Sequence, residues 1–275
     1  FSCRHTVAAP DELFVDDYAC LSFVPPYGLN QDTYRRAEFV LNPALEPPLP
    51  DHGRINRVIS GDAMSYRLGG STLAKRLDAY LAQRFGRPLA SFASVLDWGS
   101  GAGRVTRHLI RLCTGQVTGI DIDADNVAWC AGALPGARFL QGPLLPPLPC
   151  ADGSFDLVIT ISVFTHLDAA TQFLWLAELR RIVRRGGIVL ASIHGMAQMA
   201  LYGAGGQQVR DTCEQGFVVL GQNSQLDGFI PDATYYKNVA HSPDYVLREW
   251  REYFDVTEIV EGIAAHQDLV VMVRR

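Results

Sequence analysis

Short apolar runs alternate with helical patterns through most of this 275-residue chain. Five of the runs predict strands, at residues 94–98, 117–121, 138–140, 155–161 and 187–193. Two more, at residues 255–260 and 267–273, predict a final antiparallel pair joined by residues 261–266. Because strands that alternate with helices form parallel sheets covered on both faces, we expect an α/β fold. Its doubly wound, Rossmann-like sheet is expected to be seven-stranded and mostly parallel.

Capping residues set the expected limits of three helices. The first is predicted from Ser71 to Gly86, because Ser71 can cap it and its leucines recur at helical spacing. The second is predicted from Asp168 to the pair Gly186-Gly187. The third begins at Ser242-Pro243, which looks like an N-cap followed by the first helical residue, and reaches Phe254.

Two segments do not follow the alternation. Residues 1–70 are interpreted as an N-terminal arm or lid ahead of a main domain at 71–275, and the proline-rich stretch 41–50 cannot be helical. Residues 195–240 are rich in Gly, Gln and Asn and show no sustained period. We interpret them as an insertion after the fifth strand, either a cap over a substrate or a structural flap or oligomer contact.

Composition narrows the range of partners. A net charge of −5 without Lys/Arg clusters argues against a nucleic-acid substrate. No apolar run approaches the roughly 18 residues of a spanning helix, so we expect a soluble, cytoplasmic protein without a membrane partner. The numbering starts at Phe1, which leaves open a chain cut from a larger protein and a fused or partner biosynthetic enzyme. The oligomeric state stays open.

The six cysteines show no C-x-x-C spacing, and they are expected to be reduced structural thiols without a zinc site. They are Cys3, Cys20, Cys113, Cys130, Cys150 and Cys213.

The segment Val95 to Val105 reads V-L-D-W-G-S-G-A-G-R-V, a strand that runs into a glycine-spaced turn. Gly99, Gly101 and Gly103 let the backbone approach a ligand and place helix N-terminal amides beside its polar tail. Asp121 closes the next strand, where an acid can accept both ribose hydroxyls of a nucleoside. Together these features predict a nucleoside-cofactor site.

Arg104 distinguishes two cofactor classes, because it stands where the nicotinamide fingerprint has its last glycine. A cation in the first turn of a helix opposes the macrodipole. Its presence makes more sense if it binds an anion, such as the methionine carboxylate of S-adenosylmethionine. A solvated surface arginine is the alternative.

At this point residues 60–275 resemble the class I S-adenosylmethionine-dependent methyltransferases. Asp97 with its glycines resembles the family's first motif, Asp121 its second-strand acid, and residues 156–162 and 191–194 its fourth and fifth strands. The segments Phe164–Leu167 and His266–Val271 resemble those of a bacterial subgroup often found near glycan-modifying enzymes. The resemblance implies an S-adenosylmethionine cofactor.

We expect Asp97, Gly99, Gly101 and Arg104 to bind the methionine end of that cofactor, and Tyr66-Arg67 to close over its carboxylate. Asp97 has a structural alternative, which is to accept backbone amides of the turn. For Tyr66-Arg67 an ordinary surface turn is the alternative.

Asp121 and Ile122 are expected at the ribose and adenine, and Ser162 facing the cofactor. Where the family often has an acid near the adenine, this chain has Gln141 to Leu144, so a backbone amide at Leu144 is expected instead.

Methyl transfer is an in-line displacement, so the protein mainly aligns donor and acceptor and excludes water. An alcohol acceptor must also lose a proton to a base. The candidates for base or acceptor-binding residue are His166, His194, Tyr236 and His241, with Tyr235, Lys237, His266 and Asp268 nearby. For His166 the alternative is capping the following helix or packing beneath it, and for His194 it is a hydrogen bond to its neighbours. For Asp268 the alternative is fixing a turn or orienting a histidine.

The leading hypothesis is a methyltransferase acting on a small-molecule or glycan acceptor, most readily on a hydroxyl. Nitrogen methylation is an alternative. A second alternative is a protein that binds the cofactor as a scaffold and catalyses no reaction. Such a protein would lack a closed polar acceptor pocket under the insertion. An NAD-dependent oxidoreductase is a remote third, since Arg104 and the predicted final hairpin fit it poorly.

Overall fold

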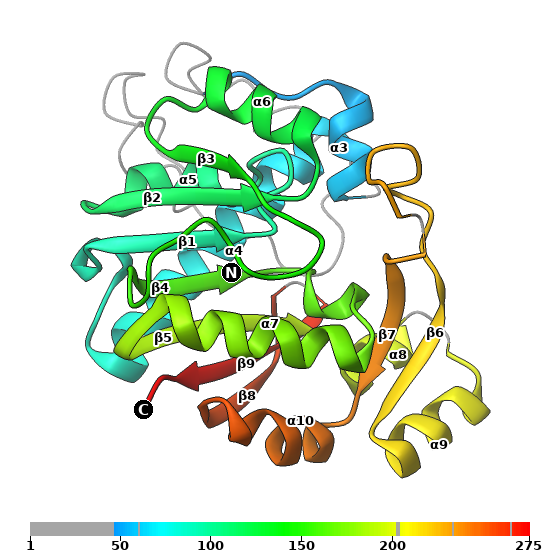
Figure 1. Ribbon diagram of the computed structural model, residues 1–275. Helices are drawn as coiled ribbons and strands as arrows, with labels where there is room; N and C mark the ends of the chain where they lie inside the picture. Colours follow the sequence, from blue (N-terminus) through cyan, green and yellow to red (C-terminus); the bar gives the residue numbers. More distant parts are fainter. Residues whose placement is uncertain (1–46, 60, 202–203, 233, 265) are drawn as a thin grey trace, which may run out of the picture.

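The computed structural model describes residues 47–59, 61–201, 204–232, 234–264 and 266–275, and within them seven strands form one sheet (Figure 1). The strand order is β3-β2-β1-β4-β5-β9-β8. Strands β1 to β5 pair in parallel, and β9 runs antiparallel between β5 and β8. The doubly wound, seven-stranded sheet is therefore confirmed. The strands are β1 (Ser94–Trp98), β2 (Gln116–Asp121), β3 (Arg138–Gln141), β4 (Phe155–Thr160), β5 (Val183–Ile193), β8 (Asp255–Ala264) and β9 (Gln267–Val273).

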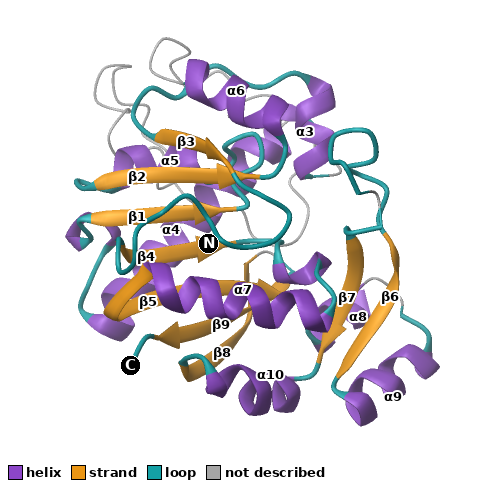
Figure 2. Cartoon of the chain, in the orientation of Figure 1, coloured by secondary structure: helices purple, strands orange, loops and turns teal. Residues whose placement is uncertain are grey.

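Helices cover both faces of this sheet (Figure 2). Leucines of α4 (Ala63–Phe85) and α5 (Thr106–Leu112) form one core cluster with the sheet, and α7 (Ala169–Ile182) and α10 (Pro243–Glu249) contribute to a second. Strand β4 shows why both faces are apolar, since Leu157 and Ile159 enter the first cluster and Val158 enters the second. The other helices are α3 (His52–Val58), α6 (Ala124–Ala133), α8 (Met196–Leu201) and α9 (Gly206–Gln215), with 3₁₀ turns at Leu89–Ser91, Phe164–His166 and Trp250–Glu252.

Helix α4 starts earlier than predicted. Asp62 caps it by accepting a hydrogen bond from the amide of Ser65, so the cap predicted at Ser71 is wrong, and Ser71 lies buried inside the helix. The helix runs through Gly70, where only glycine fits, because a Cβ there would lie 2.2 Å from the carbonyl oxygen of Arg104. This close contact fixes α4 against the start of α5, and α4 crosses the predicted boundary at residue 70. Gly86 ends the helix in a left-handed conformation, as predicted.

Helix α7 ends earlier than predicted. Its last turn stops at Ile182 and the chain enters β5 at Val183. The predicted stop at Gly186-Gly187 is wrong because these glycines pair with the last strand: Gly186 donates to the carbonyl of Arg274, and the amide of Arg274 donates to Gly187. Strand β8 likewise extends to Ala264, further than predicted.

The insertion at 195–240 is structured. It contains α8, α9 and a small antiparallel sheet of β6 (Phe217–Gln222) and β7 (Lys237–His241). This sheet stands at the side of the molecule toward which β1, β2 and β4 point (Figure 1). Ser242 then caps α10, as predicted, although α10 gives way to a 3₁₀ turn after Glu249. Residues 1–46 of the predicted arm, with Cys3 and Cys20, lie outside the described residues, and none of the described helices has the length and apolar character needed to cross a membrane.

Candidate active site

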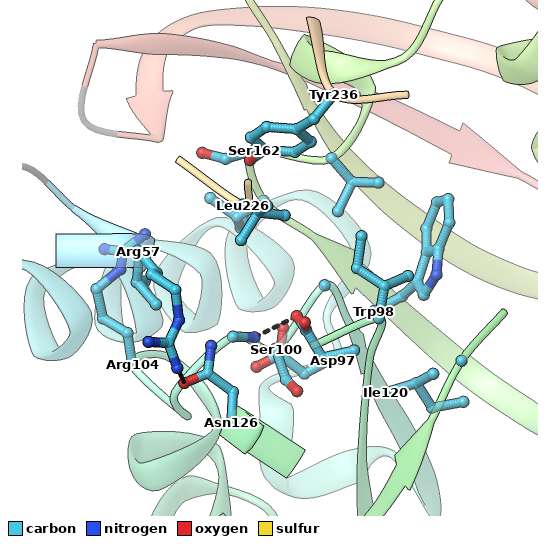
Figure 3. Close-up of a pocket in the computed structure, with 18 of the residues that line it drawn as sticks. Arg57, Asp97, Trp98, Ser100, Arg104, Ile120, Asn126, Ser162, Leu226 and Tyr236 are labelled. Carbon is cyan, nitrogen blue, oxygen red and sulfur yellow. Dashed lines mark hydrogen bonds between the residues drawn. The ribbon is translucent and has the colours of Figure 1, made fainter. Parts of the chain in front are cut away.

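A cavity opens at the carboxyl ends of β1, β2 and β4, where ligands bind in open α/β sheets (Figure 3). Gly99, Gly101, Asp121 and Ile122 line it, as predicted. Gly99 and Gly101 have φ of 80° and 51°, in the left-handed region that favours glycine. A Cβ on Gly101 would lie 2.8 Å from a methyl of Val58. We call this space the nucleoside cavity.

Asp121 is hydrogen-bonded to the glycine turn. Its Oδ2 accepts from the amide of Gly101 over 2.6 Å, and its Oδ1 accepts from the amide of Asp123 over 2.9 Å. Burial raises the pKa of the carboxyl to about 6. Each oxygen keeps a second lone pair, so the carboxylate can still accept hydroxyl protons from a ligand.

Asp97 lines the same cavity and accepts a hydrogen bond from the Thr106 hydroxyl over 2.5 Å. The acid therefore ties β1 to the first residue of α5. Its pKa rises to about 6, mainly because the group is buried.

Arg104 lines the nucleoside cavity (Figure 3). It also lines a larger cavity beside it. Its Nε is buried and has no hydrogen-bond partner among the described residues, while the side chain as a whole is partly exposed to the cavities. Burial lowers its pKa. Arg104 is therefore not the fully solvated surface arginine of the alternative. Because a buried N–H without a partner is costly, Arg104 is suited to an anionic ligand group.

Three residues predicted to contact the cofactor do not line the cavity. Tyr66 is fully buried and donates from its hydroxyl to the carbonyl of Ala102 over 2.5 Å, so it supports the glycine turn from behind. Arg67 also lies outside the cavity lining. On the adenine side Gly142, not Leu144, lines the cavity. Ser162 does line it, as predicted, with a φ of 60°.

Arg57 of α3 is a lining residue that the sequence reasoning missed. It pairs with Asp123 over 2.8 Å and with Asp125 over 2.6 Å, at the start of α6. Its guanidinium also lies 3.9 Å from the ring centroid of Phe229, in the insertion. Arg57 therefore joins α3, α6 and the insertion beside the nucleoside cavity.

A second cavity of about 730 Å³ adjoins the first. Both are lined by Arg104, Ser162 and Tyr236. Residues of the insertion form much of the second wall, and His166 and His194 face it from the ends of the central strands. We call this space the chamber. The chamber is a polar pocket under the insertion, which a scaffold protein without catalysis was expected to lack.

His166 and His194 are held in the same tautomer. Nδ1 of His166 lies 2.9 Å from the carbonyl oxygen of Lys237, and Nδ1 of His194 lies 3.0 Å from that of Val239. Because a carbonyl only accepts, each Nδ1 carries the proton and each Nε2 is left as an acceptor. Burial lowers the pKa of His166 to about 3 and that of His194 to about 4. Both rings are neutral, and the ring of Tyr236 stacks on His166 at 4.1 Å.

The helix after His166 is capped by Asp168, which accepts from the amide of Thr171, so the capping alternative for His166 is wrong. His241 is also not a site residue. It is fully buried, it lines neither cavity, and it pairs with the amide of Gln172. It lies at the end of β7, where its ring packs against Trp250.

The remaining candidates divide between the two spaces and the scaffold. Tyr235 lines the nucleoside cavity, and His266 lines the chamber. The ammonium of Lys237 pairs with Asp168 over 2.9 Å, outside both cavities. Asp268 accepts from the amide of Gly262, inside β8, over 3.0 Å, so it fixes local backbone.

Comparisons with known proteins agree with this geometry. Residues 96–191 match the family described as a methyltransferase domain. A sterol 24-C-methyltransferase of Gibberella zeae is 29% identical over 119 residues, which cover 41% of this chain and 30% of that protein. A protein of Mycolicibacterium smegmatis described as a probable S-adenosylmethionine-dependent methyltransferase is 35% identical over 98 residues, which cover 36% and 37%. The matches thus span about a third of these relatives.

A solved structure shares the fold across nearly the whole chain. It is the 1,6-didemethyltoxoflavin-N1-methyltransferase of Burkholderia thailandensis, with a TM-score of 0.53 and 16% identity, and the match covers 98% of this chain and 92% of that one. This chain contains a class I S-adenosylmethionine-dependent methyltransferase domain. The nicotinamide alternative is therefore wrong, and the observed β8–β9 pair is the final hairpin expected of a class I methyltransferase.

Gln267 of the methyltransferase domain is a second residue that the sequence reasoning missed. The amide of Ser162 donates to Oγ of Ser192, so the Ser192 hydroxyl donates in turn to Oε1 of Gln267, over 2.5 Å. Nε2 of Gln267 then donates to Ser162 Oγ over 2.9 Å and points toward Nε2 of His194 at 3.5 Å. Gln267 thus connects both cavities across β4, β5 and β9. No spacing signal marks it, because its partners lie 73 or more residues away.

Proposed function

We propose that the protein transfers a methyl group from S-adenosylmethionine to a hydroxyl group of a small-molecule or glycan acceptor. The observation that carries the proposal is the pair of adjoining cavities, one built for a nucleoside and the other polar and large enough for a second substrate. They adjoin at Ser162 and Tyr236, so a group passed from one ligand to the other would cross there.

The residues of the nucleoside cavity fit S-adenosylmethionine. Asp121 accepts the ribose hydroxyls, and the glycine turn admits the ligand beside the backbone where a Cβ at Gly101 would clash. Arg104, whose Nε has no partner among the described residues, binds the methionine carboxylate. When bound, the cofactor supplies an electrophilic methyl group on a sulfonium.

The chamber contains the residues that would bind and orient the methyl acceptor. Nε2 of His166 and of His194 can each accept the proton of an acceptor hydroxyl, which orients the oxygen and increases its electron density. Their pKa values of about 3 and 4 make both rings weak bases, so the proton leaves the oxygen as the new C–O bond forms, not before. The stacked Tyr236 and the insertion exclude water from the reacting atoms.

The relatives' printed names support small acceptors, a sterol in one and a heterocycle in another. The second of these is a nitrogen methyltransferase, which keeps an amine as the alternative acceptor. The two histidine acceptors favour the hydroxyl, since a neutral amine needs no base to attack.

The test is methyl transfer from S-adenosylmethionine carrying a ¹³C-methyl group to a mixed set of alcohols and amines, followed by mass spectrometry and NMR of the products. We expect oxygen-bound ¹³C-methyl, with transfer reduced about 10²- to 10⁴-fold in His166→Asn. His52→Asn, exposed on α3 and outside both linings, is the control and keeps the wild-type rate. Nitrogen-bound product alone, or equal rates in the two variants, contradicts the proposal.

A further inference from the structure

Carboxamide side chains dominate the polar wall of the chamber. Five of them come from the insertion and the sixth from the start of β9. They are Gln198, Gln208, Asn223, Gln225, Asn238 and Gln267. The insertion's richness in Gln and Asn, which has no periodic pattern in the sequence, therefore gathers on one surface.

Several of these groups are fixed in orientation. Nδ2 of Asn223 donates to Oδ1 of Asn238 over 3.0 Å and to Oε1 of Gln225 over 3.3 Å, and Oδ1 of Asn223 accepts from the amide of Gln225. Oε1 of Gln198 is buried and receives no hydrogen bond from the described residues. A buried acceptor of this kind is costly unless a ligand supplies the missing donor.

The chamber is also nearly free of charge. Among its described lining residues there is no Asp, Glu or Lys, and Arg104 is the one permanent cation. In the proposed function the cofactor carboxylate neutralises Arg104. Of the three histidines in the lining, which are His166, His194 and His266, the first two are neutral because burial lowers their pKa values to about 3 and 4. A charged acceptor that entered the chamber would therefore lose its hydration and would find no opposite charge to pair with, which is costly.

From this lining we infer that the acceptor is an uncharged, polyhydroxylated ring, of the kind that a sugar unit presents. A carboxamide both donates and accepts, so it can pair with neighbouring hydroxyl groups, each of which also does both. Leu73, Met199 and Leu220 supply an apolar wall for a ring face. The inference rests on the proposed methyl transfer and adds the acceptor's chemical class.

The test compares four acceptors of similar size with the full chain and S-adenosylmethionine: a neutral methyl pyranoside, the matching uronic acid, the matching amino sugar, and a planar phenol. The readouts are formation of S-adenosylhomocysteine and of the methylated product. We expect turnover of the neutral pyranoside, with kcat/KM about 100-fold or more lower for the two charged sugars and for the phenol.

Asn238→Asp provides a second readout, because it places a carboxylate in the chamber. We expect it to lower kcat/KM for the pyranoside about tenfold or more and to raise it for the amino sugar, whose ammonium it can pair. Gln215→Glu, exposed on α9 and outside the lining, is the matched control and leaves both rates unchanged.

Three outcomes would overturn the inference: turnover of the phenol or of a charged sugar in preference to the pyranoside, no methylation of any of the four, or identical behaviour of Asn238→Asp and Gln215→Glu. Binding of S-adenosylhomocysteine is measured on the same samples. If S-adenosylhomocysteine does not bind, the proposed function itself is contradicted. If it binds but the pyranoside is not methylated, only the inferred acceptor class is contradicted.

Discussion

The amide of Gly101 donates a hydrogen bond to Oδ2 of Asp121 over 2.6 Å, so the glycine turn and the second-strand acid form one unit. The bond explains how an acid at the end of β2 is held in orientation beside a turn that follows β1. Burial raises the pKa of the Asp121 carboxyl to about 6, although this hydrogen bond by itself lowers the pKa. Affinity for a nucleoside should therefore depend on pH.

Ribose hydroxyls donate to the carboxylate form of Asp121, so deprotonation favours binding. Affinity for S-adenosylhomocysteine should be constant above pH 7 and should fall as the pH drops through 6, because protonation then competes with binding. Asp121→Asn should weaken binding about 10- to 100-fold at pH 7.5, since it loses the charge-assisted bonds. Calorimetric titration at several pH values measures both effects, with the exposed Asp152→Asn as the control. A pH-independent wild type would show that Asp121 does not contact the ligand.

Gly101→Ala tests whether the ligand lies close to the backbone of the glycine turn. A Cβ at this position would lie 2.8 Å from Val58 and would force a side chain into a φ of 51°. We expect affinity for S-adenosylhomocysteine to fall about tenfold or more. Gly132→Ala is the matched control, because its Cβ meets nothing within 4 Å and it lies in helix α6, so binding should be unchanged and stability equal or higher. Equal affinities in the two variants would rule out a close approach at the turn.

Arg57→Ala tests the contact between α3, α6 and the insertion. The change leaves the buried carboxylate of Asp123 without its partner over the nucleoside cavity. We expect S-adenosylhomocysteine to dissociate about tenfold faster, a loss of roughly 1.4 kcal/mol, as measured by stopped-flow displacement. Arg84→Ala removes an exposed ion pair with Glu258 and should leave the dissociation rate as it is. A wild-type rate in Arg57→Ala would show that α3 does not retain the ligand.

The two chamber histidines should be visible by NMR without any acceptor. Long-range ¹H–¹⁵N spectra of the wild type should show Nδ1–H tautomers for His166 and His194, unchanged from pH 5 to pH 8, because burial keeps both pKa values near 3 to 4. His166→Asn and His194→Asn assign the two signals. Titration near the ordinary pKa of about 6.5 would mean that the rings are solvated and not held by β7.

Much of the fold is encoded locally, and the sequence analysis therefore predicts it. The strand cores and the caps at Gly86, Asp168 and Ser242 depend on neighbouring residues. The predicted helix limits are wrong where contacts with segments distant in the sequence determine where a helix starts or ends. Ser71 looks like the cap of α4, but the helix starts at Ala63 and its Gly70 packs against Arg104. Gly186 looks like a helix stop, but it pairs with Arg274.

The site residues also divide into those that local sequence predicts and those that depend on distant contacts. Gly99, Gly101, Asp121 and Ser162 belong to strand ends whose positions follow from the sheet, and all four line the nucleoside cavity. Tyr66 was predicted from its position before a helix, but its hydroxyl is directed to Ala102 by packing. Arg57, Gln267 and the carboxamides of the chamber could not be predicted, because their partners are brought together by the insertion and by β9.

Calorimetric titration of the full chain with S-adenosylhomocysteine, alongside NAD, at pH 7.5 tests whether this cavity is the cofactor site. We expect saturable binding of one S-adenosylhomocysteine per chain, weakened in Asp121→Asn and in Gly101→Ala, with no binding of NAD. Binding of NAD alone, or S-adenosylhomocysteine binding that neither substitution weakens, would contradict the assignment of the cavity between β1, β2 and β4 as the cofactor site.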